Sequence, residues 1–411
     1  ATGSPARRTL GQDNSRKLYG TDCEHPSYAA WLRAGLRLVR RLDGESVQQI
    51  SAMGTWIREP GTRVAGSRDL DRHKVQAPGV VPDPSGGYRL FYTAVGPARP
   101  FPACQGYILS AFSRDGLSFQ PDPGIRVAPD PLIAHGSLRL LAPTVTICGA
   151  GQWRMYFESR GTADREPVIC SAVSNDLIHW EVEQGIRLSA YGGVGGPRYI
   201  ALPDGRGRLF CSAAQFDAGG PGSDPGHGRQ ISKSVISAVT TNGLDFQLES
   251  GFRMRDRQSQ QDDAGITAAD VIVPTVADAP WTMVYSAWQD VPPGTRKPVH
   301  PSHDIEAVQN GRSADFAAAS IASDLAGYRS RIFIARSEDG LSWERQGCVL
   351  EGAGYTQDGI DAVHAEDMSL IQLADGTYRM YYAACDNDGN WSIASARSNP
   401  VFHHIPPKDR S

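Results

Sequence analysis

AFSRDGLSF (111–119), AVSNDLIHW (172–180), AVTTNGLDF (238–246) and ARSEDGLSW (335–343) are four copies of one pattern, and ASARSNP (394–400) begins a fifth. Each full copy joins a run of small and apolar residues to a polar turn and an aromatic residue. In three of them Asp-Gly or Asn-Gly supplies the positive φ that a tight hairpin turn requires. A second short run follows each full copy, so each predicts a β-hairpin. The copies recur roughly every 60 residues, apart from one longer interval, which is typical of a repeat architecture.

Another hairpin precedes each copy, in the segments 75–94, 140–159, 195–213, 269–287 and 365–384. Four strands in each of five repeats predict an all-β fold, a single five-bladed β-propeller. The fifth repeat ends after its third strand, whereas TWIREPGTRV (55–64) precedes the first repeat without a partner. We predict that this N-terminal strand closes the propeller by completing the last blade. A β-sandwich with accidental internal similarity is the alternative, and it does not predict this matching surplus and deficit.

Composition narrows the functional classes. Lys and Arg number 41 against 45 Asp and Glu, and the net charge of −4 is too small for nucleic-acid binding by bulk charge. No segment approaches the roughly 18 consecutive apolar residues of a membrane span. The 44 Gly and 28 Pro argue against a helical bundle. The seven Cys show no C-x-x-C spacing, which disfavours a zinc site or a disulfide scaffold.

We expect two regions outside the repeat pattern itself. Residues 1–50 form an N-terminal extension with an amphipathic helix at 27–42, which packs against the propeller or lies on a membrane surface. Residues 51–405 form the propeller, interrupted by an insertion at 288–330 that we interpret as a lid containing a helix at 314–326. The segment ATGSPARRTL (1–10) lacks the apolar core of a secretory signal. A cytoplasmic location is expected, although a removed signal would leave no trace.

The candidate chemistry lies where the innermost strands begin. Alignment on the aromatic residue of the second strand makes five positions equivalent, and two of them are acidic: Ala77, Ala142, Gly196, Asp270 and Asp367. Two neighbouring carboxylates can divide into a protonated acid and an ionised base, which hydrolysis of a glycosidic bond requires. The catalytic candidates are Asp270, Asp367, Glu366 and Glu158, and the substrate-binding candidates are His364, Arg198, Gln76, Trp288 and His73.

Structural roles compete with each of these assignments. Asp270 or Asp367 could bond backbone amides at the channel rim, and Glu158 could pair with Arg160 or Arg198. His364 could be an ordinary rim histidine. Trp288 could stack on a sugar ring or anchor the insertion.

The turns SRDGLSF, SNDLIHW and SEDGLSW, the five repeats and the Ala-Pro starts of the inner strands resemble glycoside hydrolase family 43 and its furanosidase and phosphorylase relatives, over residues 50–400. The resemblance implies a glycosidase-like enzyme with an Asp base, an Asp that modulates its pKa and a Glu acid on three neighbouring inner strands. Here the first two inner strands read Gln76-Ala77-Pro78-Gly79 and Leu141-Ala142-Pro143-Thr144, without an acid.

The acidic roles have therefore moved to the fourth and fifth blades, or the scaffold serves another purpose. That purpose would be a biosynthetic tailoring reaction or non-catalytic binding of a small molecule. We expect a carbohydrate or small-molecule substrate, and neither a nucleic-acid partner nor a membrane span. No cofactor is expected, although the channel could hold a cation.

Overall fold

The structure is a computed structural model, and the residues it describes contain strands but no helix. The described residues are 49–51, 56–72, 74–95, 105–149, 151–162, 165–190, 192–216, 231–255, 265–274, 279–289, 329–353, 358–388, 390–398 and 401–403. All the described residues lie in one unit of the chain, residues 46–411. Within the described ranges no helix is long and apolar enough to cross a membrane.

Three features predicted from the sequence lie outside the described residues. They are the helix at 27–42, nearly all of the insertion at 288–330 with its helix at 314–326, and His73.

The strands form five antiparallel repeats, numbered here in chain order. Repeat 1 contains β3 (Lys74–Pro82), β4 (Tyr88–Val95), β5 (Gly106–Ser113) and β6 (Gln120–Pro121). Repeat 2 contains β7 (Arg139–Ile147), β8 (Trp153–Arg160), β9 (Val168–Ser174) and β10 (Glu181–Val182). Repeat 3 contains β11 (Val194–Ala201), β12 (Gly207–Phe216), β13 (Ile231–Thr240) and β14 (Gln247–Leu248). Repeat 4 contains β15 (Ile266–Ile272), β16 (Trp281–Gln289), β17 (Arg329–Ser337) and β18 (Glu344–Leu350).

Repeat 5 takes its fourth strand from the N-terminal side of the chain, as the sequence predicts. It contains β19 (His364–Gln372), β20 (Tyr378–Cys385), β21 (Trp391–Ser398) and β2 (Trp56–Arg58). β2 pairs antiparallel with β21, with Trp56 opposite Ser398, and Val64 forms a further bridge to Ile393. One more pair joins β1 (Gln49–Ser51) to β22 (Val401–His403).

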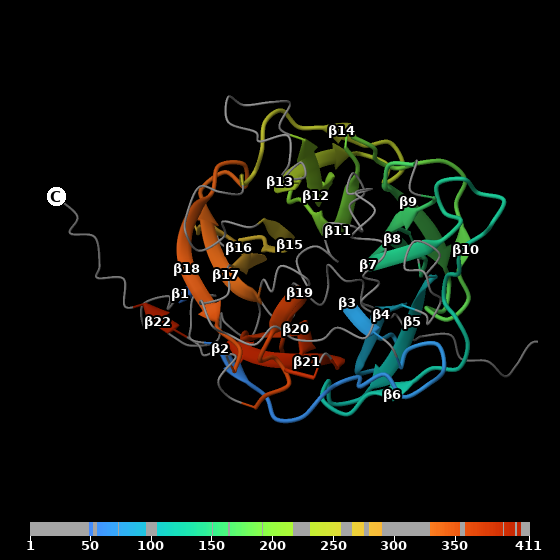
Figure 1. The fold of residues 1–411 in the computed structure, drawn as a ribbon. Helices are drawn as coiled ribbons and strands as arrows, with labels where there is room; N and C mark the ends of the chain where they lie inside the picture. Colours follow the sequence, from blue (N-terminus) through green and yellow to red (C-terminus); the bar gives the residue numbers. More distant parts are fainter. Residues whose placement is uncertain are drawn as a thin grey trace, which may run out of the picture. The chain divides into compact units, whose positions relative to one another are not determined.

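The first strand of each repeat, called the inner strand below, contacts the inner strands of two other repeats. The contacts follow the cyclic order β3, β7, β11, β15, β19 and back to β3. Figure 1 shows these five strands nearest the middle of the sheets, with the fourth strands outermost. Groups on the inner strands of all five repeats can therefore meet.

The repeated turns owe their shape to one side-chain network. In repeat 1, Asp115 Oδ1 accepts hydrogen bonds of 2.8 Å from the backbone N atoms of Leu117 and Ser118. Asp176, Asn242 and Asp339 accept the corresponding bonds in repeats 2, 3 and 4. The turn of repeat 2 has Leu177 at φ 65° where the other three have glycine. Leu177 is fully buried, so packing stabilises a conformation that glycine adopts without steric cost.

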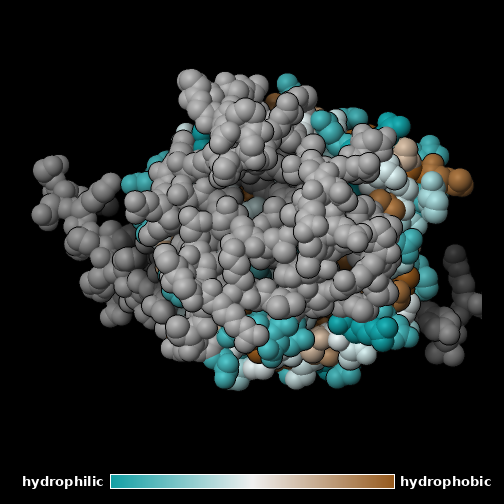
Figure 2. Space-filling view, in the orientation of Figure 1, coloured by the Kyte–Doolittle hydropathy of each residue, from teal (hydrophilic) through white to brown (hydrophobic). Residues whose placement is uncertain are grey.

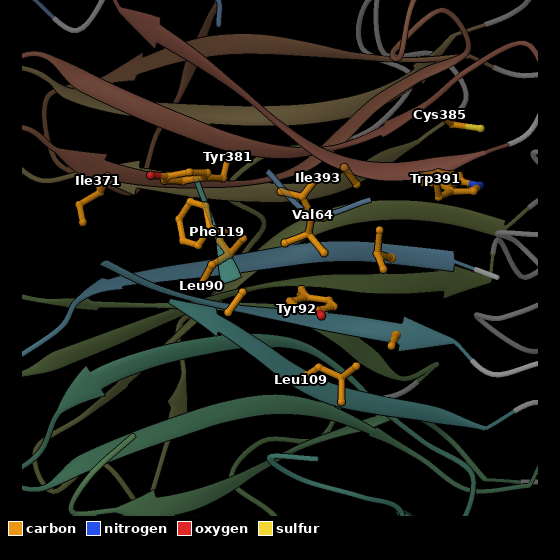
Figure 3. Packing of buried hydrophobic residues seen from close by; sticks show 14 of the residues in the cluster. Val64, Leu90, Tyr92, Leu109, Phe119, Ile371, Tyr381, Cys385, Trp391 and Ile393 are labelled. Carbon is orange, nitrogen blue, oxygen red and sulfur yellow. The ribbon is translucent and has the colours of Figure 1, made fainter. Parts of the chain in front are cut away.

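The aromatic residue after each turn packs on the second strand of a neighbouring repeat. Four ring pairs have centroids 5.5–6.3 Å apart: Trp180–Phe91, Phe246–Tyr156, Trp343–Phe210 and Phe119–Tyr381. The last pair joins repeat 1 to repeat 5, and Figure 3 shows it in a buried cluster with Val64 and Ile393. Between repeats 4 and 5, Trp56 of β2 belongs to the same buried cluster as Val284. β2 thus supplies the aromatic residue that repeat 5 itself lacks.

The exposed large hydrophobic residues in the described ranges are few: Ile57, Leu132, Ile147, Val182, Ile186 and Leu248. Figure 2 shows the coloured residues along the edge as mainly hydrophilic, with isolated hydrophobic ones between them.

Candidate functional site

Four inner strands carry the same β-bulge near their start. Two residues there oppose a single residue of the second strand: Ala77-Pro78 in β3, Ala142-Pro143 in β7, Gly196-Pro197 in β11 and Asp367-Met368 in β19. The first residue of each pair has a left-handed φ, between 48° and 57°. That conformation costs a residue other than glycine about 1–2 kcal/mol. The other interactions of the inner strands must therefore hold Asp367 in place.

Asp270 does not share the position of Asp367, so the register predicted from the sequence is wrong at this point. Asp270 of β15 pairs with Val284, and the residue that pairs with the equivalent Tyr381 of repeat 5 is Ser369. The hairpin between β15 and β16 is longer than the other four, and the register shift in β15 falls earlier, between Ile266 and Ala268. A fixed spacing from the aromatic residue therefore gives a different position in repeat 4.

Arg198 lies at the meeting point of the inner strands. Its guanidinium is buried and donates to the carbonyl oxygens of Pro78 at 2.8 Å, Met368 at 3.0 and 3.2 Å, and Pro143 and Pro197, each at 3.2 Å. Burial lowers the pKa of Arg198, and the charges of Asp270 and Asp367 oppose this shift. We predicted a substrate-binding role for Arg198, but its donors are directed at the backbone.

The side chain of Asp270 links β15 to the inner strand of the next repeat, β19. Its Oδ2 atom accepts a hydrogen bond of 2.9 Å from Leu370 N, and its Oδ1 atom accepts one of 2.8 Å from Val271 N. Burial raises the pKa of Asp270, while Arg198 and these two amides favour the ionised form. Equivalent residues in two other repeats make the same inter-repeat bond: Thr144 Oγ1 accepts from Tyr199 N, and Ser369 Oγ accepts from Val80 N. Asp270 thus occupies a structural position.

Glu158 occupies a second ring of inter-repeat bonds. It accepts a hydrogen bond of 3.0 Å from Gly196 N, as Thr93 Oγ1 does from Ala142 N and Ser286 Oγ from Asp367 N. The other carboxylate oxygen pairs with Arg160, and both side chains are buried. The pairing of Glu158 with Arg160 was one of the alternatives that the sequence left open.

Glu366 differs from the other acids of the inner strands. Its side chain belongs to a residue that is 7% exposed, and its Oε2 atom has no hydrogen-bond partner among the described residues. An unsatisfied buried polar atom costs about 1–3 kcal/mol, so a structural purpose alone does not account for this one. The residue beside it, Asp367, has its backbone N bonded to Ser286 Oγ and its charge near Arg198. Two adjacent acids, Glu366 and Asp367, therefore lie at the start of β19. The Oε2 atom of Glu366 has no hydrogen-bond partner among the described residues.

His364, at the start of β19, belongs to a stacked cluster. Its Nδ1 atom lies 2.9 Å from Ser330 Oγ, and its ring stacks on Trp391 with centroids 5.2 Å apart. Lys74 Nζ lies 4.0 Å from the centroid of the same indole. The sequence does not indicate a contact between Lys74 and Trp391, because it requires the starts of three strands, β3, β19 and β21, to meet in space.

The remaining binding candidates are spread around the strand starts. Gln76 is half-buried on β3 at the position that Glu366 holds on β19. Trp288 is buried near the end of β16, and its backbone N donates to Gly265 O at 2.9 Å. No group of three or more His, Cys, Asp or Glu side chains in the described ranges has the arrangement of a metal site.

Comparisons with known proteins give the fold. No protein-family model matches the sequence. A search of curated proteins also finds no match. Solved structures do match: a β-1,2-mannobiose phosphorylase from Listeria innocua has a TM-score of 0.58 and 12% identity, and covers 84% of this chain and 97% of its own.

Two further structures match to a similar extent. A thermostable family-43 glycoside hydrolase has a TM-score of 0.55 and 13% identity, over 86% of this chain and 99% of its own. A structure described under the GH130 family of mannoside phosphorylases has a TM-score of 0.56 and 12% identity, over 88% of this chain and 99% of its own. These identities are informative about the fold alone. The chain has the fold of family-43 glycoside hydrolases and mannoside phosphorylases, as the resemblance in its turns and inner strands implies.

Proposed function

We propose that this protein is a carbohydrate-active enzyme that cleaves a glycoside at the bulged ends of its inner strands. The fold is that of glycoside hydrolases and mannoside phosphorylases, which supports the class of reaction. The observation that carries the proposal is Glu366, a buried carboxyl group whose Oε2 atom has no partner among the described residues.

The scaffold of the proposal is a five-bladed β-propeller in which β2 completes the last blade. Three observations support it. The inner strands contact one another in a cycle, β2 pairs with β21, and the aromatic packing between repeats continues from repeat 5 to repeat 1. In this arrangement the four shared bulges and the start of β15 surround the propeller axis, and Arg198 lies at its centre.

In the proposed mechanism Glu366 is the general acid, and it protonates the glycosidic oxygen as the bond to the sugar breaks. Asp367 is the ionised carboxylate that activates the attacking water. Asp270 and Glu158 do not touch the substrate in this mechanism, because backbone amides and Arg160 occupy their oxygens. Both acids act by holding the neighbouring inner strand.

A second candidate function rests on a separate observation. The positions equivalent to Asp367 in the first three repeats are Ala77, Ala142 and Gly196, so no acid stands there. This absence favours a sugar-binding protein that no longer cleaves its ligand.

A screen of 4-nitrophenyl furanosides and pyranosides, each with and without inorganic phosphate, tests both functions. Turnover that Glu366→Gln lowers and Glu338→Gln preserves supports the enzyme, since Glu338 is exposed on a turn. Phosphate-dependent turnover identifies a phosphorylase. Saturable binding of a sugar, measured by calorimetry, with no turnover of any of the glycosides supports the second candidate.

A further inference from the structure

Basic residues begin three neighbouring inner strands at the same position. Lys74 of β3, Arg139 of β7 and His364 of β19 each lie three residues before the first residue of the bulge in their strand. All three are buried, with exposed fractions of 8%, 4% and 2%. β19, β3 and β7 are consecutive in the cycle of inner-strand contacts. Basic side chains therefore follow one another around this part of the strand starts.

Lys74 differs from other buried cations of the described residues. Arg89, Arg154 and Arg379 each pair with a carboxylate. The side chain of Lys74 forms no hydrogen bond or ion pair with another described residue, and its Nζ atom lies 4.0 Å from the centroid of the Trp391 ring. The face of an indole stabilises an ammonium group without neutralising its charge or accepting its three N–H groups as an oxygen atom would. Because a desolvated donor without an acceptor is costly, Lys74 is suited to an anion that the described residues do not supply.

This ammonium group lies beside the strand that carries the proposed acid. Trp391 is at one end of the buried cluster in Figure 3, and its ring also stacks on His364, with centroids 5.2 Å and planes 14° apart. His364 Nδ1 lies 2.9 Å from Ser330 Oγ, which fixes the imidazole. Glu366 follows His364 by two residues in the regular part of β19, so it lies on the same face of the strand, about 7 Å further along. The contact between Lys74 and Trp391 thus adjoins the position of Glu366.

We propose that Lys74 binds a carboxylate group of the substrate, which makes the substrate a glycoside of a uronic acid. The inference rests on the proposed function and adds the class of sugar to it. A uronic acid differs from the neutral sugar by a carboxylate in place of the hydroxymethyl group, so one sugar ring carries both the glycosidic oxygen and an anion. A single ammonium group beside an apolar ring matches the single charge of a carboxylate, whereas phosphate usually takes several charged or backbone donors.

Pairs of glycosides that differ only in this group test the inference. The 4-nitrophenyl glucuronides, galacturonides and mannuronides are compared with the corresponding glucosides, galactosides and mannosides, in both anomeric forms. Calorimetry with the methyl glycosides of the same sugars measures binding without any need for turnover. For at least one pair, the wild-type protein should favour the uronide by about 10-fold or more in kcat/KM and in Kd, the scale of a hydrogen bond between charged groups.

Variants of Lys74 assign this preference to its charge. In Lys74→Met the ratio of uronide to neutral glycoside should fall by about 10-fold or more, in kcat/KM and in Kd. Lys74→Arg keeps the charge and should retain most of the preference. Arg114→Met is the matched control, because it also removes one positive charge, from an exposed residue in the turn at the opposite end of repeat 1. It should leave the ratio unchanged. Thermal unfolding shows whether each variant folds.

Three results would overturn the inference. The first is a wild-type protein that favours no uronide over its neutral partner, whether or not the variants fold. The second is a folded Lys74→Met that keeps the preference. The third is inorganic phosphate that binds the wild-type protein but not Lys74→Met, with no preference for a uronide. Uronide binding that depends on Lys74, without turnover of any glycoside, supports the inference and contradicts the proposed function. Turnover of neutral glycosides without a preference for uronides does the reverse, so the two failures are distinguishable.

Discussion

The carboxylate of Asp270 accepts a hydrogen bond of 2.9 Å from the backbone N of Leu370, so a side chain of repeat 4 holds the inner strand of repeat 5. Thr144 and Ser369 make the same kind of bond between other repeats. Asp270, which the sequence analysis placed among the catalytic candidates, therefore belongs to a series of hydrogen bonds between neighbouring repeats.

Asp270→Ala should destabilise the protein by about 3–5 kcal/mol, because it leaves Leu370 N unpaired and removes a counter-charge from buried Arg198. Ser369→Ala should cost about 1 kcal/mol, since it removes a single neutral hydrogen bond. Asp69→Asn is the control, because the Asp69 side chain is 95% exposed. Urea unfolding measures all three variants. Equal stability of Asp270→Ala and the control would contradict the structural role.

Gly195 leaves the space that Glu158 occupies. A Cβ atom at residue 195 would lie 2.1 Å from Glu158 Oε2, so Gly195→Ala should destabilise the protein by about 2 kcal/mol or more. Combined with Glu158→Ser, the two substitutions should cost less than the sum of their separate effects, because the smaller hydroxyl group that Ser212 and Ser286 provide at this position relieves the clash, although Glu158→Ser alone breaks the buried pair with Arg160. Thermal unfolding of the single and double variants measures the coupling. Gly149→Ala serves as control, because the nearest atom to its added Cβ is 3.8 Å away. Additive effects of the two substitutions would show that the contact is unimportant.

The repeated turns should contribute to acid sensitivity. Hydrogen bonds from backbone amides lower the pKa of Asp115 and Asp339 in the folded protein. Burial opposes this shift at Asp176, but hydrogen bonds from the His179 side chain and from backbone amides outweigh it and lower the pKa. A pKa lower in the folded than in the unfolded state stabilises the protein above the unfolded pKa, and this contribution is lost as the pH falls through the folded pKa. The repeat 3 turn has Asn242 in this place and shows that the turn forms without a charge. The triple variant with Asn at the three positions should therefore lose stability less steeply below about pH 4. An unchanged slope in pH-dependent urea unfolding would contradict this prediction.

β2 should be needed for a monomeric protein. Deletion of residues 1–66 removes the strand that pairs with β21 and exposes that edge, which favours aggregation. Deletion of residues 1–45 is the control, because it removes none of the described strands. Size-exclusion chromatography with light scattering compares the two. A soluble, cooperatively folding monomer that lacks residues 1–66 would argue against closure by β2.

Strand positions follow from the sequence because turn residues act locally. In each of the four full turns the Ser or Thr and the Asp or Asn bond to each other and to the next few residues, so the local sequence is enough to predict the turn. The pairing of β2 with β21 was also predictable, because the fifth repeat lacks a fourth strand and the N-terminal strand lacks a partner in its own part of the sequence. The register of β15 was not, because it depends on the hairpin length and the bulge at Thr267, which have no signature in the hydrophobic pattern.

The site is only partly predictable for the same reason. Sequence places Glu366 and Asp367 at the start of an inner strand. Whether the carboxylate of an acid accepts hydrogen bonds from the protein depends on residues that are distant in the sequence. Glu158 accepts one from Gly196 N, and Asp270 accepts one from Leu370 N. The burial of Arg198 likewise requires carbonyls from four inner strands to converge, and residue types alone do not indicate this.

The central claim is that Glu366 protonates the leaving group, and the dependence of Glu366→Gln on the leaving group tests it most directly. For the glycoside that the screen identifies, kcat/KM is measured with a 2,4-dinitrophenyl and with a methyl leaving group, for wild type and variant. The dinitrophenolate departs without a proton, whereas the methoxide requires one. We predict that Glu366→Gln loses on the order of 10²-fold or more on the methyl glycoside and about 10-fold or less on the dinitrophenyl glycoside. An equal loss on both substrates, or no loss on either, would contradict the assignment of Glu366 as the acid.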